Sequence, residues 1–67
     1  MRDIERYLEA HPHSSDTLLG VCDWWLIAPL PPVIVLAALD RLVRDGRIAA
    51  RTIPGGVVYE RAREGNA

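Results

Sequence analysis

The spacing of the apolar residues changes at Gly46, and this change limits the fold more than any other feature of the sequence. Before Gly46, apolar side chains recur every three or four residues, which is typical of helices that bury one face. After it, Ile48, Ala50 and Thr52 alternate with two arginines and an alanine, which is the period of a strand. Helices followed by strands predict a mostly helical α+β fold.

A turn signal follows the first predicted strand. The run Pro-Gly-Gly at positions 54–56 supplies residue types that reverse the chain, and residues 57–61 are predicted to form the returning strand. We therefore expect a C-terminal two-stranded β-hairpin. Residues 63–67 are predicted to be a disordered tail, which leaves residues 1–62 as a single domain.

Two predicted helices occupy the N-terminal part of the chain. The first covers residues 3–10 and ends before Pro12, since the residue preceding a proline is pushed out of the helical conformation. The serines at 14–15 offer side-chain oxygens to the free amides of a second helix, which we expect to run to about Leu26. The apolar stripes are Ile4, Tyr7 and Leu8 in the first helix and Leu18, Val21, Cys22 and Trp25 in the second, widened by Leu19 and Leu26.

Three prolines place the boundary of a third helix. Pro29, Pro31 and Pro32 cannot lie inside a continuous helix, whereas a proline fits the first helical turn. We expect the helix to begin near Pro31 or Pro32 and to continue to Asp45. Gly46 then supplies the left-handed residue that commonly follows a helix end.

Length and composition restrict the class of protein. At 67 residues the chain has room for one core only. Its one cysteine, Cys22, cannot form an intramolecular disulfide, and no basic segment with an apolar stretch opens the chain, so we expect a cytoplasmic location. The longest uncharged run, residues 24–39, has 16 residues and contains three prolines. A spanning helix needs about 20 apolar residues, so we expect no membrane span.

Three helices followed by a hairpin resemble the winged helix-turn-helix family. The most specific stretch is VLAALDRLVRDGRI at residues 35–48, which looks like that family's recognition helix running through glycine into the first wing strand. Gly55, Gly56 and Tyr59 match the hairpin, and the resemblance covers residues 3–61. It implies a three-helix winged-helix domain with a β-hairpin wing. The core residues it implies are Val35, Ala38, Leu39 and Leu42 in the third helix, with Ile48 and Tyr59 anchoring the wing.

The positions that the resemblance turns toward a DNA groove are apolar in this chain. They are residues 32–34, 36 and 37, and none of their side chains can donate a hydrogen bond to a base or a phosphate. The segment 24–31 is also longer than the tight turn of a DNA-reading motif. We therefore predict a non-catalytic module for protein–protein contact, as a homodimer or by docking on a larger complex.

If the third helix packs as the resemblance implies, four of its apolar residues lie outside the core, and we expect them to form an exposed apolar patch of roughly a few hundred square ångströms. It includes whichever of two adjacent tryptophans faces outward, because tryptophan is favoured at interface anchors. The alternative is that the extension of the second helix folds back and covers these residues. The candidate interface residues are Trp24, Trp25, Val33, Ile34, Leu36 and Val43.

Arginines support a second hypothesis, a DNA-binding transcriptional regulator that holds phosphates with its wing. The acidic residues Asp40, Asp45, Glu60 and Glu64 are interleaved with these arginines and weaken their field, so a solvated face is the favoured interpretation. The candidate nucleic-acid contacts are Arg41, Arg44, Arg47, Arg51 and Arg61.

Catalytic, metal and cofactor chemistry have no convincing residues. His11, His13 and Cys22, with two aspartates nearby, fit no tetrahedral zinc spacing. No glycine-rich phosphate loop or paired-carboxylate motif is present, so we expect no enzyme, no cofactor and no small-molecule substrate. An accessory subunit of an enzyme or electron-transfer complex remains a further possibility that the sequence does not distinguish from a docking module.

Overall fold

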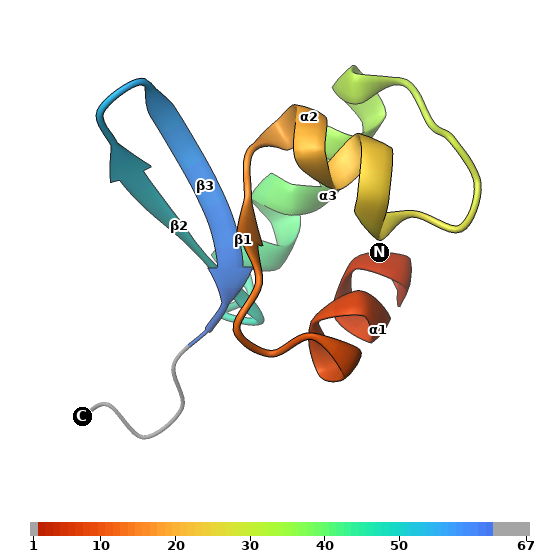
Figure 1. Cartoon of the computed structure of the whole chain (residues 1–67), viewed down its shortest axis with the longest axis horizontal. Coiled ribbons are helices and arrows are strands. Elements are labelled where there is room, and N and C mark those ends of the chain that lie inside the picture. The colour runs from red at the N-terminus through yellow and green to blue at the C-terminus, as the bar shows by residue number, and fades with distance from the viewer. Residues whose placement is uncertain (1, 63–67) are drawn as a thin grey trace.

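The computed structural model describes residues 2–62, which form a small α+β fold with three helical segments and a three-stranded antiparallel sheet (Figure 1). The helices occupy one side of the picture and the hairpin extends from the other. The elements in chain order are α1 (Arg2–Ala10), β1 (Ser15–Asp16), α2 (Leu18–Gly20), the π-helical turn η1 (Val21–Trp25), α3 (Pro32–Arg44), β2 (Ile48–Ile53) and β3 (Gly56–Arg61).

The first helix forms where its amphipathic pattern predicts it. Ile4 and Leu8 are fully covered, and Tyr7 lies half-buried beside them. The chain leaves α1 at His11, whose N–H donates to the Tyr7 carbonyl at 2.8 Å. A turn over the next residues then brings Ser15 to the sheet rather than into a helix.

The second helix begins later than predicted and is less regular. Thr17, not a serine, caps it: its backbone is extended and its hydroxyl oxygen accepts a hydrogen bond from the Gly20 N–H at 3.3 Å. Ser15 and Asp16 instead form β1, which pairs with β3. After one α-helical turn the chain widens into η1, which ends at Trp25.

The third helix confirms both of its predicted boundaries. Pro32 occupies its first turn, and Asp45 follows its last residue. The N–H of Gly46 donates to the Val43 carbonyl at 3.0 Å and that of Arg47 donates to the Leu42 carbonyl at 2.9 Å. With Gly46 at a φ of 77°, these two bonds close the helix in a Schellman motif and direct the chain into β2.

The predicted hairpin is present, but it belongs to a larger sheet. β2 and β3 pair from Ile48 with Arg61 to Ile53 with Gly56, around a loop of Pro54 and Gly55. β1 adds a third strand on the far side of β3, which gives the order β1-β3-β2 (Figure 1). The expected two-stranded hairpin is therefore corrected to a three-stranded sheet, because backbone groups on the outer side of β3 pair with a two-residue strand too short to show a periodic pattern.

The core lies where the helices meet the base of the sheet. Of the residues predicted for the third helix, Val35, Leu39 and Leu42 are buried and Ala38 is half-buried. The predicted wing anchors Ile48 and Tyr59 are buried as well. The complete buried cluster is Ile4, Leu8, Val21, Trp25, Val35, Leu39, Leu42, Ile48 and Tyr59.

Two further sequence predictions concern the C-terminal tail and the absence of a membrane-spanning helix. The predicted tail, residues 63–67, lies outside the described residues. Within residues 2–62, none of the helices has the length and apolar character needed to cross a membrane.

Candidate protein-binding surface

Large apolar side chains are exposed along one continuous stretch of the chain, residues 19–36. Trp24, Ile27 and Val33 are about three-quarters exposed, at 73%, 76% and 74%. The stretch contains one charged residue, Asp23. We refer to its exposed large apolar residues together as the apolar surface: Leu19, Trp24, Ile27, Leu30, Val33, Ile34 and Leu36.

The segments that carry the apolar surface lie together at one end of the molecule (Figure 1). α2 and η1 each pack against α3, and the loop of residues 26–31 connects them. The first two turns of α3 hold three of the seven side chains, because Val35 and Leu39 take up the buried face of that helix and leave its other faces open.

The loop inside this stretch is fixed at both ends. The Ile27 N–H donates to Asp3 Oδ2 of α1 at 3.4 Å, and Pro31 and Pro32 lead directly into α3. Proline also fixes φ, so the segment has few alternative conformations. Residues 27–31 are all exposed. Ile27 and Leu30 consequently point into solvent from a loop in which Pro29 and Pro31 restrict the backbone.

A shallow hollow of about 250 Å³ lies next to the loop, between α1 and η1. Trp24 and Ile27 line it from the apolar surface, and Tyr7 and Trp25 also contribute to its wall. The other residues that line it are Asp3, Arg6, Ala10, His11 and Leu26. An apolar side chain of a partner placed in this hollow would contact aromatic and aliphatic residues, with the polar side chains of Asp3, Arg6 and His11 at its margin.

The two adjacent tryptophans have different environments. Trp24 faces outward, whereas Trp25 is 3% exposed and stacks on Tyr7 with ring centroids 4.9 Å apart and planes 11° apart. Including Trp25 among the interface candidates was therefore wrong, because it fills the core beside α1. The prediction that Val43 lies on the exposed interface is corrected as well, since its side chain is half-buried and packs against the core.

The remaining interface candidates lie on the surface. Trp24, Val33, Ile34 and Leu36 are exposed, so the alternative in which the helix-two extension covers them is wrong. The role of these four residues in binding stays a prediction.

Sequence reasoning missed three members of the apolar surface. Leu19 was assigned to the buried stripe of the second helix, but it is 65% exposed because α2 and η1 do not form one continuous α-helix. Ile27 and Leu30 lie in the loop between the second and third helices, where no periodic pattern indicates which side chains are exposed. Two large aliphatic residues in a proline-rich loop without charges were the available signal.

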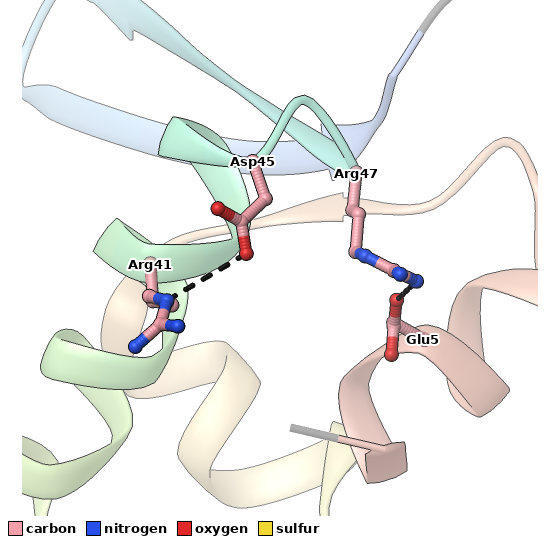
Figure 2. Close-up of polar contacts among 4 residues, drawn as sticks. All are labelled: Glu5, Arg41, Asp45 and Arg47. Carbon is pink, nitrogen blue, oxygen red and sulfur yellow. Dashed lines mark hydrogen bonds and ion pairs between the residues drawn. The ribbon is translucent and has the colours of Figure 1, made fainter.

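Of the five candidate nucleic-acid contacts, three are paired with carboxylates. In Figure 2, Arg47 Nη1 donates to Glu5 Oε1 at 2.8 Å, and Arg41 Nε lies 3.6 Å from Asp45 Oδ2. Arg51 donates from Nε and Nη2 to one oxygen of Glu60 at 3.2 and 3.1 Å. Within residues 2–62, Arg44 and Arg61 make no ion pair.

The environment of Arg47 shows how this end of the molecule is neutralised. Its hydrogen bond and charge interaction with Glu5 raise the pKa of Arg47 above the ordinary value, with a smaller contribution from Asp45, although burial acts in the opposite direction. Arg47 and Arg61 share a hollow of about 260 Å³ with Glu5 and Glu9. Cations and anions are therefore mixed here rather than separated into a basic face.

The residues considered for metal binding are not brought together. In the part of the chain that the structure describes, no three His, Cys, Asp or Glu side chains are grouped closely enough to hold a metal ion. The ring of His11 packs against Tyr7 in a tilted arrangement, with centroids 4.4 Å and planes 36° apart, and Cys22 is a half-buried free thiol at the margin of the core. Packing accounts for both positions.

Comparison with known proteins adds no family to this description. No protein-family model, curated protein sequence or solved structure matches the chain.

Proposed function

We propose that this chain is a non-catalytic winged-helix module that binds another protein chain, a second copy or a larger protein, through the apolar surface. The observation that carries the proposal is the exposure of seven large apolar side chains within residues 19–36. Large exposed apolar patches mark sites of contact with proteins, membranes or ligands.

The winged-helix part of the proposal is supported by the order of the elements. Helical segments precede a hairpin, and Gly46 joins α3 directly to β2. The use of this arrangement for protein contact is supported by the first turns of α3, where Val33 and Ile34 replace residues able to donate hydrogen bonds to DNA.

The stiffness of the loop favours binding at this place. Ordering side chains and loops on association is unfavourable, by roughly 0.5–1.5 kcal/mol for each flexible side chain that becomes immobilised. The proline-rich loop and its hydrogen bond to Asp3 order Ile27 before a partner arrives. Trp24, an amphipathic residue of the type enriched at interface centres, lines the adjacent hollow.

The composition of the surface also defines the chemistry of the partner. With Asp23 as the one charge between residues 19 and 36, the contact would be largely apolar. Its affinity should change little with ionic strength, because screening acts on charged groups. Binding to a nucleic-acid backbone would instead weaken steeply as salt is added.

The test begins with affinity capture from the native host on the wild-type domain. The retained protein is purified and titrated by calorimetry against wild type, the double variant Trp24→Ser/Ile27→Ser and the control Val57→Ser, an exposed apolar residue of β3 outside the apolar surface. The double variant should bind about thirtyfold more weakly or worse, and the control should bind like wild type. Circular dichroism verifies folding of each variant.

Two outcomes would contradict the proposal. One is equal affinity of the double variant and wild type for the captured protein. The other is a domain that retains no protein and stays monomeric at every concentration.

A DNA-binding role is the second candidate, and Arg44 and Arg61 favour it because they have no carboxylate partner within residues 2–62. It requires duplex binding that decreases steeply with salt and decreases further in Arg44→Ala/Arg61→Ala. Fluorescence anisotropy with a labelled duplex at low salt measures both effects. Absence of binding there would eliminate this role.

A further inference from the structure

The outer edge of β2 is open. In the strand order β1-β3-β2, β2 has a neighbour on one side only (Figure 1). Residues 50–52 of this strand are exposed. An open edge carries unpaired backbone N–H and C=O groups and is a template for another strand.

The hairpin geometry identifies which backbone groups face outward. Ile53 and Gly56 flank a two-residue loop and therefore form a hydrogen-bonded pair, and such pairs alternate along an antiparallel ladder. Ala49, Arg51 and Ile53 thus direct their N–H and C=O groups toward β3. The outward-facing groups belong to the alternate residues Ile48, Ala50 and Thr52.

The edge lacks the features that usually block strand addition. β2 contains no proline and no lysine, and its six pairs with β3 follow one another without a bulge. Its one charged residue, Arg51, is hydrogen-bonded to Glu60 of the same chain. The two alanines at positions 49 and 50 leave the backbone accessible.

We propose that β2 pairs antiparallel with β2 of a second copy, around a two-fold axis at Ala50. This register places Ala50 opposite Ala50 of the other copy and Thr52 opposite Ile48. Because Ile48 is 3% exposed, the pairing is centred on the exposed residues Ala50 and Thr52. A register centred on Arg51 would set two arginines opposite each other, which is destabilising. A register centred on Ala49 would leave Thr52 unpaired.

Charge complementarity supports a second copy as the occupant. In this register, Ala49 lies between Glu60 of its own chain, its partner across the hairpin, and Arg51 of the second copy. All three project from the same face of the joined sheet, because residues opposite each other in a ladder share a face. The methyl group of Ala49 is small enough for the arginine to reach across it to Glu60, so each Glu60, which already accepts from Arg51 of its own chain, would face a second arginine from the other copy.

This interface is separate from the apolar surface and does not rest on the function proposed above. The hairpin and the loop of residues 26–31 extend on opposite sides of the molecule (Figure 1). A dimer joined at β2 would therefore leave both apolar surfaces accessible.

Sedimentation equilibrium at micromolar to millimolar concentrations tests the proposal, with wild type, Ala50→Pro and Trp24→Ser. Proline at position 50 removes an outward N–H and obstructs a neighbouring strand, while the ladder with β3 keeps its bonds. Wild type and Trp24→Ser should dimerise alike, and Ala50→Pro should dimerise about tenfold more weakly or worse. Circular dichroism confirms that Ala50→Pro retains the fold.

Disulfide cross-linking tests the register. In a Cys22→Ala background, Ala50→Cys should oxidise to a covalent dimer, because Cα atoms of a hydrogen-bonded antiparallel pair lie about 5.5 Å apart. Thr52→Cys is the matched control on the same strand face, and its two copies would be about 14 Å apart along the strands. Ala50→Cys should therefore cross-link far faster than Thr52→Cys.

Each contrary result would overturn the proposal. A wild-type monomer at every concentration excludes any dimer, and equal dimerisation of Ala50→Pro excludes the β2 edge. Loss of the dimer in Trp24→Ser would assign self-association to the apolar surface instead. Equal cross-linking at positions 50 and 52 would refute the register.

Discussion

The two ends of this molecule differ in their surface residues: one carries paired charges and the other carries exposed apolar side chains. At the junction of α1, α3 and β2, Arg41 and Arg47 are paired with carboxylates of the same chain (Figure 2), and in the hairpin Arg51 is paired with Glu60. Along residues 19–36, by contrast, seven large apolar side chains are exposed next to a single charge. One end satisfies its groups internally, and the other leaves apolar area in contact with water.

This difference indicates where binding free energy is available. Exposed ion pairs contribute about 0–1 kcal/mol and exchange readily with water. Burial of apolar area contributes roughly 25 cal/mol for each Å² removed from water. The side chains of the apolar surface remain exposed in the monomer, so this free energy is available for binding a partner. The charged end is consequently the weaker candidate for recognition, although it contains most of the arginines.

The largest contrast is expected between the adjacent tryptophans. Trp25→Ala removes a buried ring that stacks on Tyr7 and should lower the free energy of unfolding by about 3–5 kcal/mol. Trp24→Ala, on the exposed side, should change it by less than about 0.5 kcal/mol. Urea denaturation followed by circular dichroism measures both. Similar losses in the two variants would remove the distinction between core and surface on which the binding proposal depends.

A smaller effect with a change of sign is expected at Gly20, under the apolar surface. A Cβ at this position would overlap the Asp16 carboxylate, which can rotate away only by giving up its hydrogen bond from the Thr17 N–H, so Gly20→Ala should destabilise the fold by about 1 kcal/mol or less. Gly20 has a helical φ of −63°. In an Asp16→Ala background, where the overlap is gone, Gly20→Ala should instead stabilise by about 0.5–1 kcal/mol. The same sign in both backgrounds would show that the overlap does not control this helix start.

The stability of the sheet side should depend on alkaline pH through Tyr59. Burial raises the pKa of Tyr59 above the ordinary value of 10.0, and the charge of Asp40 raises it further. The folded state therefore holds this proton more tightly than the unfolded chain. The resulting stability is fully present below about pH 10 and is lost as pH rises through the higher folded-state pKa.

Urea unfolding at several alkaline pH values measures this dependence. Tyr59→Phe should lose less stability above pH 10 than Tyr7→Phe, in which Tyr59 remains. Parallel pH profiles for the two variants would show that Tyr59 does not control the loss.

The smallest effect is expected for the ion pair of Arg47 and Glu5 at the charged end. Single and double alanine variants form a cycle whose coupling should be weakly favourable at low salt and absent at an ionic strength of about 1 M. Thermal unfolding of the four proteins provides the measurement. A coupling that persists at high salt would make this pair a structural element comparable to the core.

Much of the fold could be predicted because the backbone preferences of single residues mark where helices and strands begin and end. The prolines near position 31 and Gly46 mark the ends of α3 through their backbone preferences, and the alternation after Gly46 marks the hairpin. β1 could not be predicted, since two residues carry no period and their strand conformation is imposed by pairing with β3. Because Ser15 is held in the sheet by this pairing, it does not cap the second helix, and Thr17 does so instead.

The candidate site was less predictable than the fold. The sequence showed that Val33, Ile34 and Leu36 follow the prolines on helix three, but the choice between Trp24 and Trp25 depended on the packing of η1 against Tyr7. The periodic pattern predicts a continuous α-helix with Leu19 on its buried stripe, whereas the chain forms a π-helical turn after Gly20 and Leu19 is exposed.

The measurement that tests the central claim most directly is ¹⁹F NMR of the domain labelled with 5-fluorotryptophan. Trp24 and Trp25 give separate resonances, of which the exposed one alone should shift between H₂O and D₂O. On titration with the protein captured from the host, the account predicts that the Trp24 resonance loses this solvent shift, whereas the Trp25 resonance shows none before or after binding. A Trp24 resonance that keeps its full solvent shift in the saturated complex would contradict binding through the apolar surface.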